Sequence, residues 1–276
     1  MTALTPQEIT QTISDSGVAK GAKSAVSLFI LGILAGVYIA FASEGSSMAA
    51  FNLLADPKTY GLGRCLAGLI FPGGLMLVVI AGGELFTGNT MMLLPLIQKR
   101  ISVFALLRNW FIVYAGNFAG SVFLAYLIVH SGQLHSGADL LGGVTVKIAA
   151  TKCHYTFTEA LCLGIMCNWL VCLAVWMAAG AKDVTGKIFA IFFPIWLFIT
   201  SGFEHSVANM YYISAGLFMK YQPLNCDVYI PDEVFNSLTW TNFFFANLIP
   251  VTLGNIIGGG VFVALAYYYA YRTKQV

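Results

Sequence analysis

The sequence predicts an all-α membrane protein with six transmembrane helices, arranged as two inverted three-helix repeats in which the second and fifth helices are broken. Two of the observations behind this prediction come from composition: the 276 residues are 58% hydrophobic, and only 9% carry a charge. A soluble domain carries roughly 25% charged residues, so much of this surface must face lipid. The third observation is that short sequence patterns occur twice in the same order, which predicts two related halves.

The repeated patterns define the two halves. Glu84 and Asn89 return as Glu204 and Asn209 with the same spacing. An odd number of crossings per half turns the second half upside down, and inverted repeats with interrupted helices are typical of a transport pathway near the bilayer midplane. The other pairs are Leu31-Gly32-Ile33 with Leu163-Gly164-Ile165, and Asn109, Val113, Gly116, Asn117 and Gly120 with Asn247, Val251, Gly254, Asn255 and Gly258.

Hydropathy places the membrane segments. We expect residues 1–24 to form a cytoplasmic N-terminal segment with a short helix that begins at a Thr5/Glu8 capping box. Residues 25–271 would form one transmembrane domain with halves 25–130 and 156–271, and 272–276 a cytoplasmic tail. The six expected segments are 25–43, 65–97, 103–129, 156–179, 188–217 and 243–271. The second and fifth exceed the roughly 20 residues of one crossing, so we expect breaks at 84–89 and 202–206.

The distribution of Lys and Arg predicts the orientation. Nine of these residues fall on the side of both termini and five on the other side, so the positive-inside rule places both termini in the cytoplasm of a multi-pass inner-membrane protein. The polar N-terminus predicts no cleaved targeting segment. The nine are Lys20, Lys23, Lys99, Arg100, Arg108, Lys182, Lys187, Arg272 and Lys274; the five are Lys58, Arg64, Lys147, Lys152 and Lys220.

The two breaks predict how a permeant would be held. New helix N-termini near Thr87 and Ser206 would point partial positive charge at the midplane, which favours an anionic or strongly polar permeant over a metal cation. Glu84 and Glu204 are costly in lipid. We expect both to be structural, either bonded to loop N–H groups across the break or protonated, together with the asparagines at 89 and 209.

Four further polar side chains are candidates for the pathway. His205 is the one histidine in a predicted membrane segment, and its titration range suits proton exchange with a weak acid. Thr87 offers a hydroxyl to the permeant or to His205. Lys152 is either an interfacial lysine or a charge that concentrates anions at the pathway entrance. Asn168 lies within the fourth segment, where its amide must find a partner.

Other functions fit the sequence less well. The net charge of +2 predicts no nucleic-acid partner, and the six cysteines match no metal or disulfide pattern, so we expect no cofactor. A water or glycerol channel would be expected to carry Asn-Pro-Ala at both breaks, but Asn89 precedes Thr90 and Asn209 precedes Met210. An intramembrane enzyme would need a nucleophile–base pair, a carboxylate dyad or a metal set. A scaffold without transport would leave the duplicated breaks unexplained.

The residues around the breaks resemble the formate/nitrite transporter family, through Phe86-Thr87, residues 201–210 and residues 247–255, with a further resemblance at 160–176. The resemblance implies a homopentamer of aquaporin-like protomers, each with its own pore. It implies that His205 is the central pore histidine close to Thr87, that Lys152 is a vestibule lysine, and that the N-terminal helix lies at the pore mouth. Two apolar constrictions would be formed by Leu85 with Phe198 and by Phe71 with Leu75, and Val171 would line the pore near Asn168.

We therefore expect a channel or transporter for small monovalent weak-acid anions, with protons exchanged at His205. Phe71 and Phe198 favour formate, while nitrite, hydrosulfide, acetate and lactate stay open. The pair Gly88-Asn89 departs from the small hydroxyl residues that several formate channels carry after the threonine, and so leaves the preference among these anions open.

Overall fold

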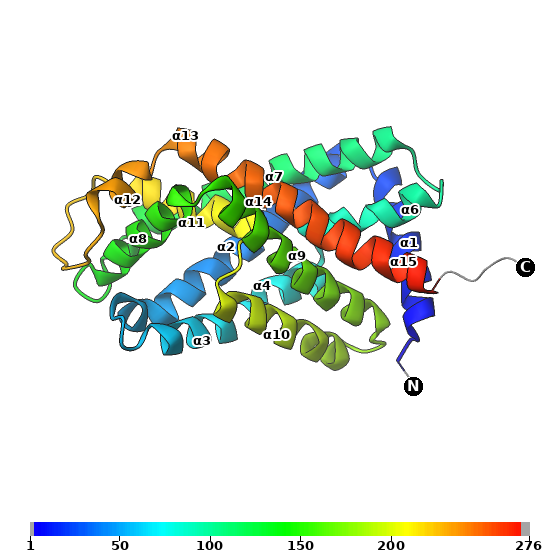
Figure 1. Ribbon diagram of the computed structural model, residues 1–276, viewed down its shortest axis with the longest axis horizontal. Helices are drawn as coiled ribbons and strands as arrows, with labels where there is room; N and C mark the ends of the chain where they lie inside the picture. Colours follow the sequence, from blue (N-terminus) through cyan, green and yellow to red (C-terminus); the bar gives the residue numbers. More distant parts are fainter. Residues whose placement is uncertain (1–2, 272–276) are drawn as a thin grey trace, which may run out of the picture.

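The structure is a computed structural model that describes residues 3–271, and over this range it consists of helices joined by turns and loops (Figure 1). Six helical segments of this part of the chain are long and apolar enough to cross a membrane, which confirms the predicted fold class. They are Ala25–Ala55, Tyr60–Gly82, Val103–His130, Phe157–Gly180, Val184–Ser201 and Trp240–Tyr271. The first is longer than expected, because its helix continues past residue 43 into the next loop.

The second membrane segment is broken where the sequence predicts it. Helices α3 (Tyr60–Ile70) and α4 (Pro72–Met76) lead into a π-helical turn, η1 (Leu77–Gly82). Gly82 has φ +101°, a conformation that favours glycine, and Gly83 continues in extended backbone. The chain then re-enters helix as α5 (Phe86–Asn89), η2 (Thr90–Met92) and α6 (Leu93–Ile97).

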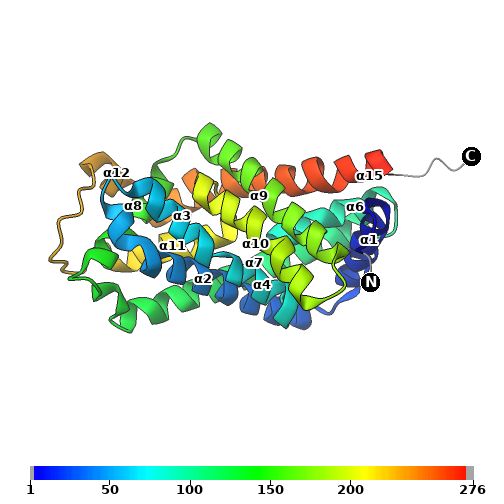
Figure 2. The same cartoon turned by 90° about the horizontal axis from the view of Figure 1, so that it is seen from below.

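The fifth segment breaks in the corresponding way. Helix α10 (Val184–Ser201) ends at Gly202, whose φ of +77° again suits glycine, and α11 (Ser206–Met219) begins four residues later. Helices α3 and α10 lie side by side (Figure 2), so the parts of the two broken segments that precede the breaks are neighbours.

The remaining helices complete the two halves. Helices α2 (Ala25–Ala55), α7 (Val103–His130) and α9 (Phe157–Gly180) are continuous crossings. The last crossing contains two π-helical stretches. It runs through α13 (Trp240–Asn242), η4 (Phe243–Leu248), α14 (Ile249–Ile256), η5 (Ile257–Leu265) and α15 (Ala266–Tyr271). The predicted tail at 272–276, with Arg272 and Lys274, lies outside the described residues.

One substantial helix was not predicted. Helix α8 (Leu140–His154) occupies the stretch expected to be a loop before the fourth segment, between the short turn η3 (Gln133–His135) and the membrane helix α9. The counterpart of α8 is α1 (Pro6–Ala22), because Lys20 and Lys152 each lie four residues before the helix N-caps Ser24 and Thr156. A further short helix, α12 (Asp232–Ser237), interrupts the last loop. Figure 1 places α1 and α8 at opposite ends of the molecule, as inverted repeats require.

The repeated glycines are the points where helix backbones touch. A Cβ on Gly116 of α7 would lie 2.7 Å from the Phe29 carbonyl oxygen of α2, and a Cβ on Gly164 of α9 would lie 2.7 Å from the Val251 oxygen of α14. Gly120 and Gly258 allow closer approaches still, to Ile33 and Ile165. Small residues of this kind let membrane helices pack at short range. The duplicated spacing therefore reflects the same helix crossing built twice.

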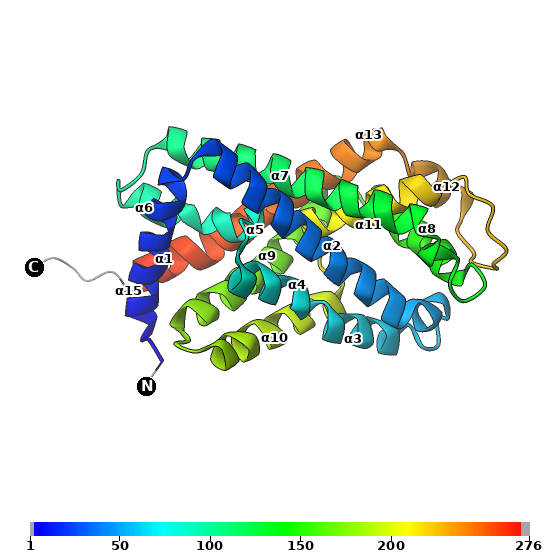
Figure 3. The same ribbon diagram turned by 180° about the vertical axis from the view of Figure 1, so that it is seen from behind.

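Helix α1 is tied to the end of the bundle by polar contacts. The predicted capping box is present: the Thr5 N–H donates to Glu8 Oε2 at 2.7 Å, and the pKa of Glu8 is below its ordinary value because this N–H and the Thr5 hydroxyl favour the carboxylate. Ser14 contacts Gln98 and accepts a bond from Arg100, which also pairs with Asp15 at 2.6 Å. Figure 3 shows α1 beside α6 at the same end as α15.

A methyl group at Gly116 tests the helix contact. We expect Gly116→Ala to lower the free energy of unfolding by about 1–3 kcal/mol, because the Phe29 backbone cannot move aside as a flexible side chain would. Gly73→Ala is the matched control, since a Cβ there would meet nothing within 4 Å. Thermal unfolding in detergent measures both; equal melting temperatures for the two variants would contradict the packing argument.

Candidate functional site

The two broken helices meet at Thr87 and His205. Thr87 Oγ1 lies 3.0 Å from His205 Nε2, and both side chains are buried. The other ring nitrogen, Nδ1, accepts the backbone N–H of Ala208 at 3.1 Å. Since Nδ1 is an acceptor, the neutral ring carries its proton on Nε2, and the hydrogen-bond pattern assigns that proton to the bond with Thr87. The sequence predicted this closeness, and the structure brings the two residues together.

Two asparagines that the sequence analysis noted only as repeats bridge the breaks. Asn117 Oδ1 accepts the N–H of Phe86 at 2.9 Å, while its Nδ2 donates to the Glu84 carbonyl at 2.9 Å. Asn255 does the same for Ser206 and Glu204, at 3.0 Å each. The first N–H of each half-helix is thus bonded to an asparagine side chain and is not available to a permeant. The duplication itself was the signal for this role.

The two break carboxylates are held by lysines and asparagines. Glu84 pairs with Lys20 at 3.0 Å and Lys23 at 2.6 Å, and accepts the Asn89 amide at 2.9 Å. The Asn89 amide also donates to the side chain of another asparagine, Asn109. The sequence predicts loop N–H groups or a bound proton as the partners of these carboxylates, but the structure shows lysine partners. The helix that precedes each half brings a lysine to the break.

The second carboxylate repeats this arrangement. Glu204 pairs with Lys152 at 2.6 Å and accepts the Asn209 amide at 2.6 Å. Asn209 also donates to Asn247 Oδ1 at 2.8 Å, and Asn247 returns to the Lys152 carbonyl at 2.9 Å. The Lys152 side chain is only 13% exposed. Lys152 is therefore an ion-paired residue of the break, and it also lines the cavity on that side of the break.

Apolar side chains flank the Thr87–His205 contact. The Phe71 and Phe198 rings meet edge to face, with centroids 5.5 Å apart, and Phe198 lies 6.1 Å from the His205 ring. Leu75 and Leu85 instead line one cavity together. Phe71 and Leu75 are four residues apart in a helical segment, so their side chains lie on one face, about one turn apart in depth.

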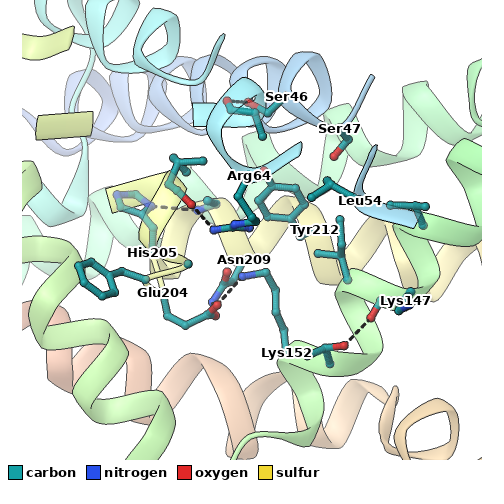
Figure 4. A pocket seen from close by; sticks show the side chains of 18 of the residues that line it. Ser46, Ser47, Leu54, Arg64, Lys147, Lys152, Glu204, His205, Asn209 and Tyr212 are labelled. Carbon is teal, nitrogen blue, oxygen red and sulfur yellow. Dashed lines mark hydrogen bonds and ion pairs between the residues drawn. The ribbon is translucent and has the colours of Figure 1, made fainter. Parts of the chain in front are cut away.

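A cavity lies on either side of this centre. The α1 cavity, next to helix α1, has a volume of about 500 Å³, and the α8 cavity, next to helix α8, about 150 Å³ (Figure 4). Each is lined by three cations and one carboxylate. In the α1 cavity these are Lys20, Lys23, Lys187 and Glu84; in the α8 cavity they are Arg64, Lys147, Lys152 and Glu204.

Asn168 finds the partners that its burial requires. Its amide donates to the Thr87 carbonyl and Thr90 Oγ1 at 3.1 Å each, and to the Asn255 carbonyl at 2.6 Å. Asn168 thus fixes the backbone of Thr87 against the other half. Val171, one turn further on, is buried, and neither residue lines the two cavities. Within residues 3–271, no group of three or more His, Cys, Asp or Glu side chains could hold a metal ion.

A model of the formate/nitrite transporter family matches residues 7–269. The chain belongs to the formate/nitrite transporter family. It is 42% identical over 261 residues to a probable formate transporter of Methanothermobacter thermautotrophicus, covering 90% of this chain and 89% of that protein. It is 40% identical over 272 residues to the formate channel BtFdhC of Bacillus thuringiensis, covering 98% and 96%.

Solved structures of the family agree with the fold. One described as a pentameric formate channel with formate bound is 38% identical, with a TM-score of 0.76, over 90% of this chain and 97% of that one. Another, described as an FNT family ion channel, is 32% identical with a TM-score of 0.81, over 95% and 98%. The resemblance seen in the sequence is confirmed: the protein is a multi-pass membrane channel or transporter and not an enzyme.

The different numbers of lysines at the two breaks predict different tolerance to their loss. We expect Lys152→Met to destabilise the fold by about 3–5 kcal/mol, because Glu204 is left buried without a cation. Lys23→Met should cost less than about 1 kcal/mol, since Lys23 is partly exposed and Lys20 still pairs with Glu84.

Thermal unfolding in detergent measures these variants together with Lys152→Met/Glu204→Gln, which should recover much of the loss. A Lys152→Met protein as stable as Lys23→Met would refute the assignment of a buried pair.

Proposed function

We propose that the protein is a channel or transporter for formate and related small weak-acid anions, with proton exchange at His205. The observation that carries this proposal is the Thr87–His205 contact, which lies between apolar side chains and separates two cavities with an excess of cations. The formate channel relatives support the choice of formate. Nitrite and hydrosulfide are the alternatives within the family.

The cavities supply the first step. Three cations against one carboxylate attract an anion into each cavity and raise its local concentration. The anion then faces the buried side chains of Phe71, Phe198, Leu75 and Leu85, which offer no hydrogen bond. A bare carboxylate loses far more solvation there than thermal energy can supply, so it crosses only after it gains a proton.

His205 supplies the proton at that point. A second proton on the ring would occupy Nδ1 and break the bond from Ala208, so the ring gains it only while an anion at Nε2 stabilises the charged form. Transfer of the Nε2 proton to the anion leaves a neutral acid and a neutral ring. The acid then passes the apolar side chains and leaves a ring protonated on Nδ1. The original tautomer returns when Nδ1 releases its proton to water of a cavity and Nε2 takes up a proton from water, after which the Thr87 hydroxyl again accepts the Nε2 hydrogen bond.

The assembly and location follow the relatives. We propose a homopentamer, as described for the solved formate channel, with residues 25–271 forming one channel domain in each subunit. The large exposed apolar side chains, such as Phe111 at 77% exposed and Phe104 at 74%, face lipid or a neighbouring subunit. We propose the inner membrane as the location, and the Lys and Arg distribution favours an orientation with the α1 cavity and both termini on the cytoplasmic side.

Uptake into proteoliposomes tests the function. For the wild type we expect selective formate flux that is faster at about pH 5.5 than at about pH 7.5, because translocation consumes a proton on the entry side. His205→Asn should reduce this flux by about tenfold or more and remove its pH dependence beyond that of empty liposomes. Stopped-flow measurement of the flux of formate, nitrite, hydrosulfide, acetate and lactate identifies the preferred anion.

His130→Asn is the control, since His130 is an exposed residue at the end of α7. Unchanged pH-dependent flux in His205→Asn would remove the histidine from the mechanism. Rapid water or glycerol flux without any anion flux would refute the proposed substrate class.

A further inference from the structure

We infer that Arg64 is the anion-binding residue of the α8 cavity and that its guanidinium receives the carboxylate or nitrite group before His205 acts. This inference rests on the proposed function for its physiological meaning. The anion site itself is argued from the charges of the cavity, and binding can be measured without transport.

The argument begins with the three cations of the α8 cavity. Lys152 is compensated, since its ammonium lies 2.6 Å from Glu204 Oε1, and Figure 4 shows it directed to that carboxylate and Asn209. Lys147 lies toward the rim, because it also lines a neighbouring shallow pocket with Pro57 and Tyr60. Arg64 is the cation that remains: among the ion pairs of the described residues, none includes it.

Arg64 is also held in place from the side of the pore. Its Nη2 donates to the carbonyl of Ile199, the residue after Phe198. A Cβ built on Gly202 would lie 3.4 Å from the same nitrogen, so the guanidinium rests against the backbone of the second break. Gly202 needs its left-handed backbone for the break, and its missing side chain leaves room for the guanidinium.

The bond from Nη2 to the Ile199 carbonyl leaves the other N–H groups of the guanidinium available to a ligand. A carbonyl oxygen orients the group but does not cancel its charge, and the other N–H groups of the planar fork match a carboxylate or nitrite. Figure 4 shows Arg64 between Tyr212 and His205, so an anion on it lies on the way to the histidine. A permanently charged guanidinium would bind at any physiological pH, whereas the pH dependence of flux would still arise at His205.

Three variants separate charge from structure. We expect Arg64→Gln to raise the half-saturation concentration for formate flux by about tenfold, as for the loss of one charge-assisted hydrogen bond, and to leave the shape of the pH profile unchanged. Arg64→Lys should recover most of this loss because it keeps the charge. Lys147→Gln removes a cation from the rim of the same cavity and should change the half-saturation concentration by less than about twofold.

A binding measurement makes the result independent of transport. Sodium formate should raise the melting temperature of the detergent-solubilised wild type and of Lys147→Gln, and this rise should be smaller in Arg64→Gln. Sodium sulfate at equal ionic strength controls for general salt effects. Equal half-saturation and equal formate-dependent stabilisation in wild type and Arg64→Gln would overturn the inference, as would an Arg64→Lys protein as impaired as Arg64→Gln.

The two hypotheses fail in different ways. If the wild type carries no formate flux but loses formate-dependent stabilisation in Arg64→Gln, the anion site stands and the proposed function is wrong. If the wild type carries pH-dependent formate flux that Arg64→Gln leaves unchanged in half-saturation, the function stands and the role of Arg64 is wrong.

Discussion

The ion pair between a lysine and a break glutamate is the interaction on which the rest of this structure depends. Backbone that leaves helical geometry inside a bilayer must satisfy its polar groups within the protein. Glu84 and Glu204 anchor the two interrupted stretches, and the bridging asparagines Asn117 and Asn255 close them. These bonds fix the backbone that carries Thr87 and His205, and Asn168 adds bonds between the halves. The Thr87–His205 contact thus follows from how two unwound segments are made tolerable in a membrane.

At the breaks, some charged residues neutralise the buried carboxylates and others set the charge of the cavities. Lys152 and Glu204 balance each other one to one, whereas Lys20 and Lys23 together leave one positive charge beyond that of Glu84. Residues outside the ion pairs, such as Lys187 on one side and Arg64 on the other, add to the positive charge of each cavity. An anion therefore meets net attraction on both sides of a centre that has no formal charge of its own. Such a profile draws ions in without trapping them at the narrowest point.

The sequence predicted the fold and much of the site, for reasons that are physical. Glycines at the breaks, a duplicated Glu–Asn spacing and overlong apolar runs leave visible signals, so the breaks could be foreseen. The closeness of Thr87 and His205 was implied by the family resemblance. Helix α8 could not, because a short helix outside the membrane segments has neither their hydropathy nor their length. The lysine partners of Glu84 and Glu204 could not be predicted for the same reason. Lys20 and Lys152 lie far from these glutamates in the chain, on the two helices that hydropathy does not detect. The contact between the Phe71 and Phe198 rings depends on how deep each residue lies in its helical segment, and sequence spacing alone does not give this depth.

Each half of the chain contains the partners of its own break carboxylate. The residues bonded to Glu84 lie between Lys20 and Asn117, and those bonded to Glu204 between Lys152 and Asn255. Contacts across the halves, such as those of Asn168 with Thr87 and of Thr87 with His205, are between uncharged groups if the ring is neutral. During synthesis, the first half can therefore pair Glu84 with its lysines before the second half has emerged from the ribosome. Neither half needs a cation from the other to hold its own break carboxylate.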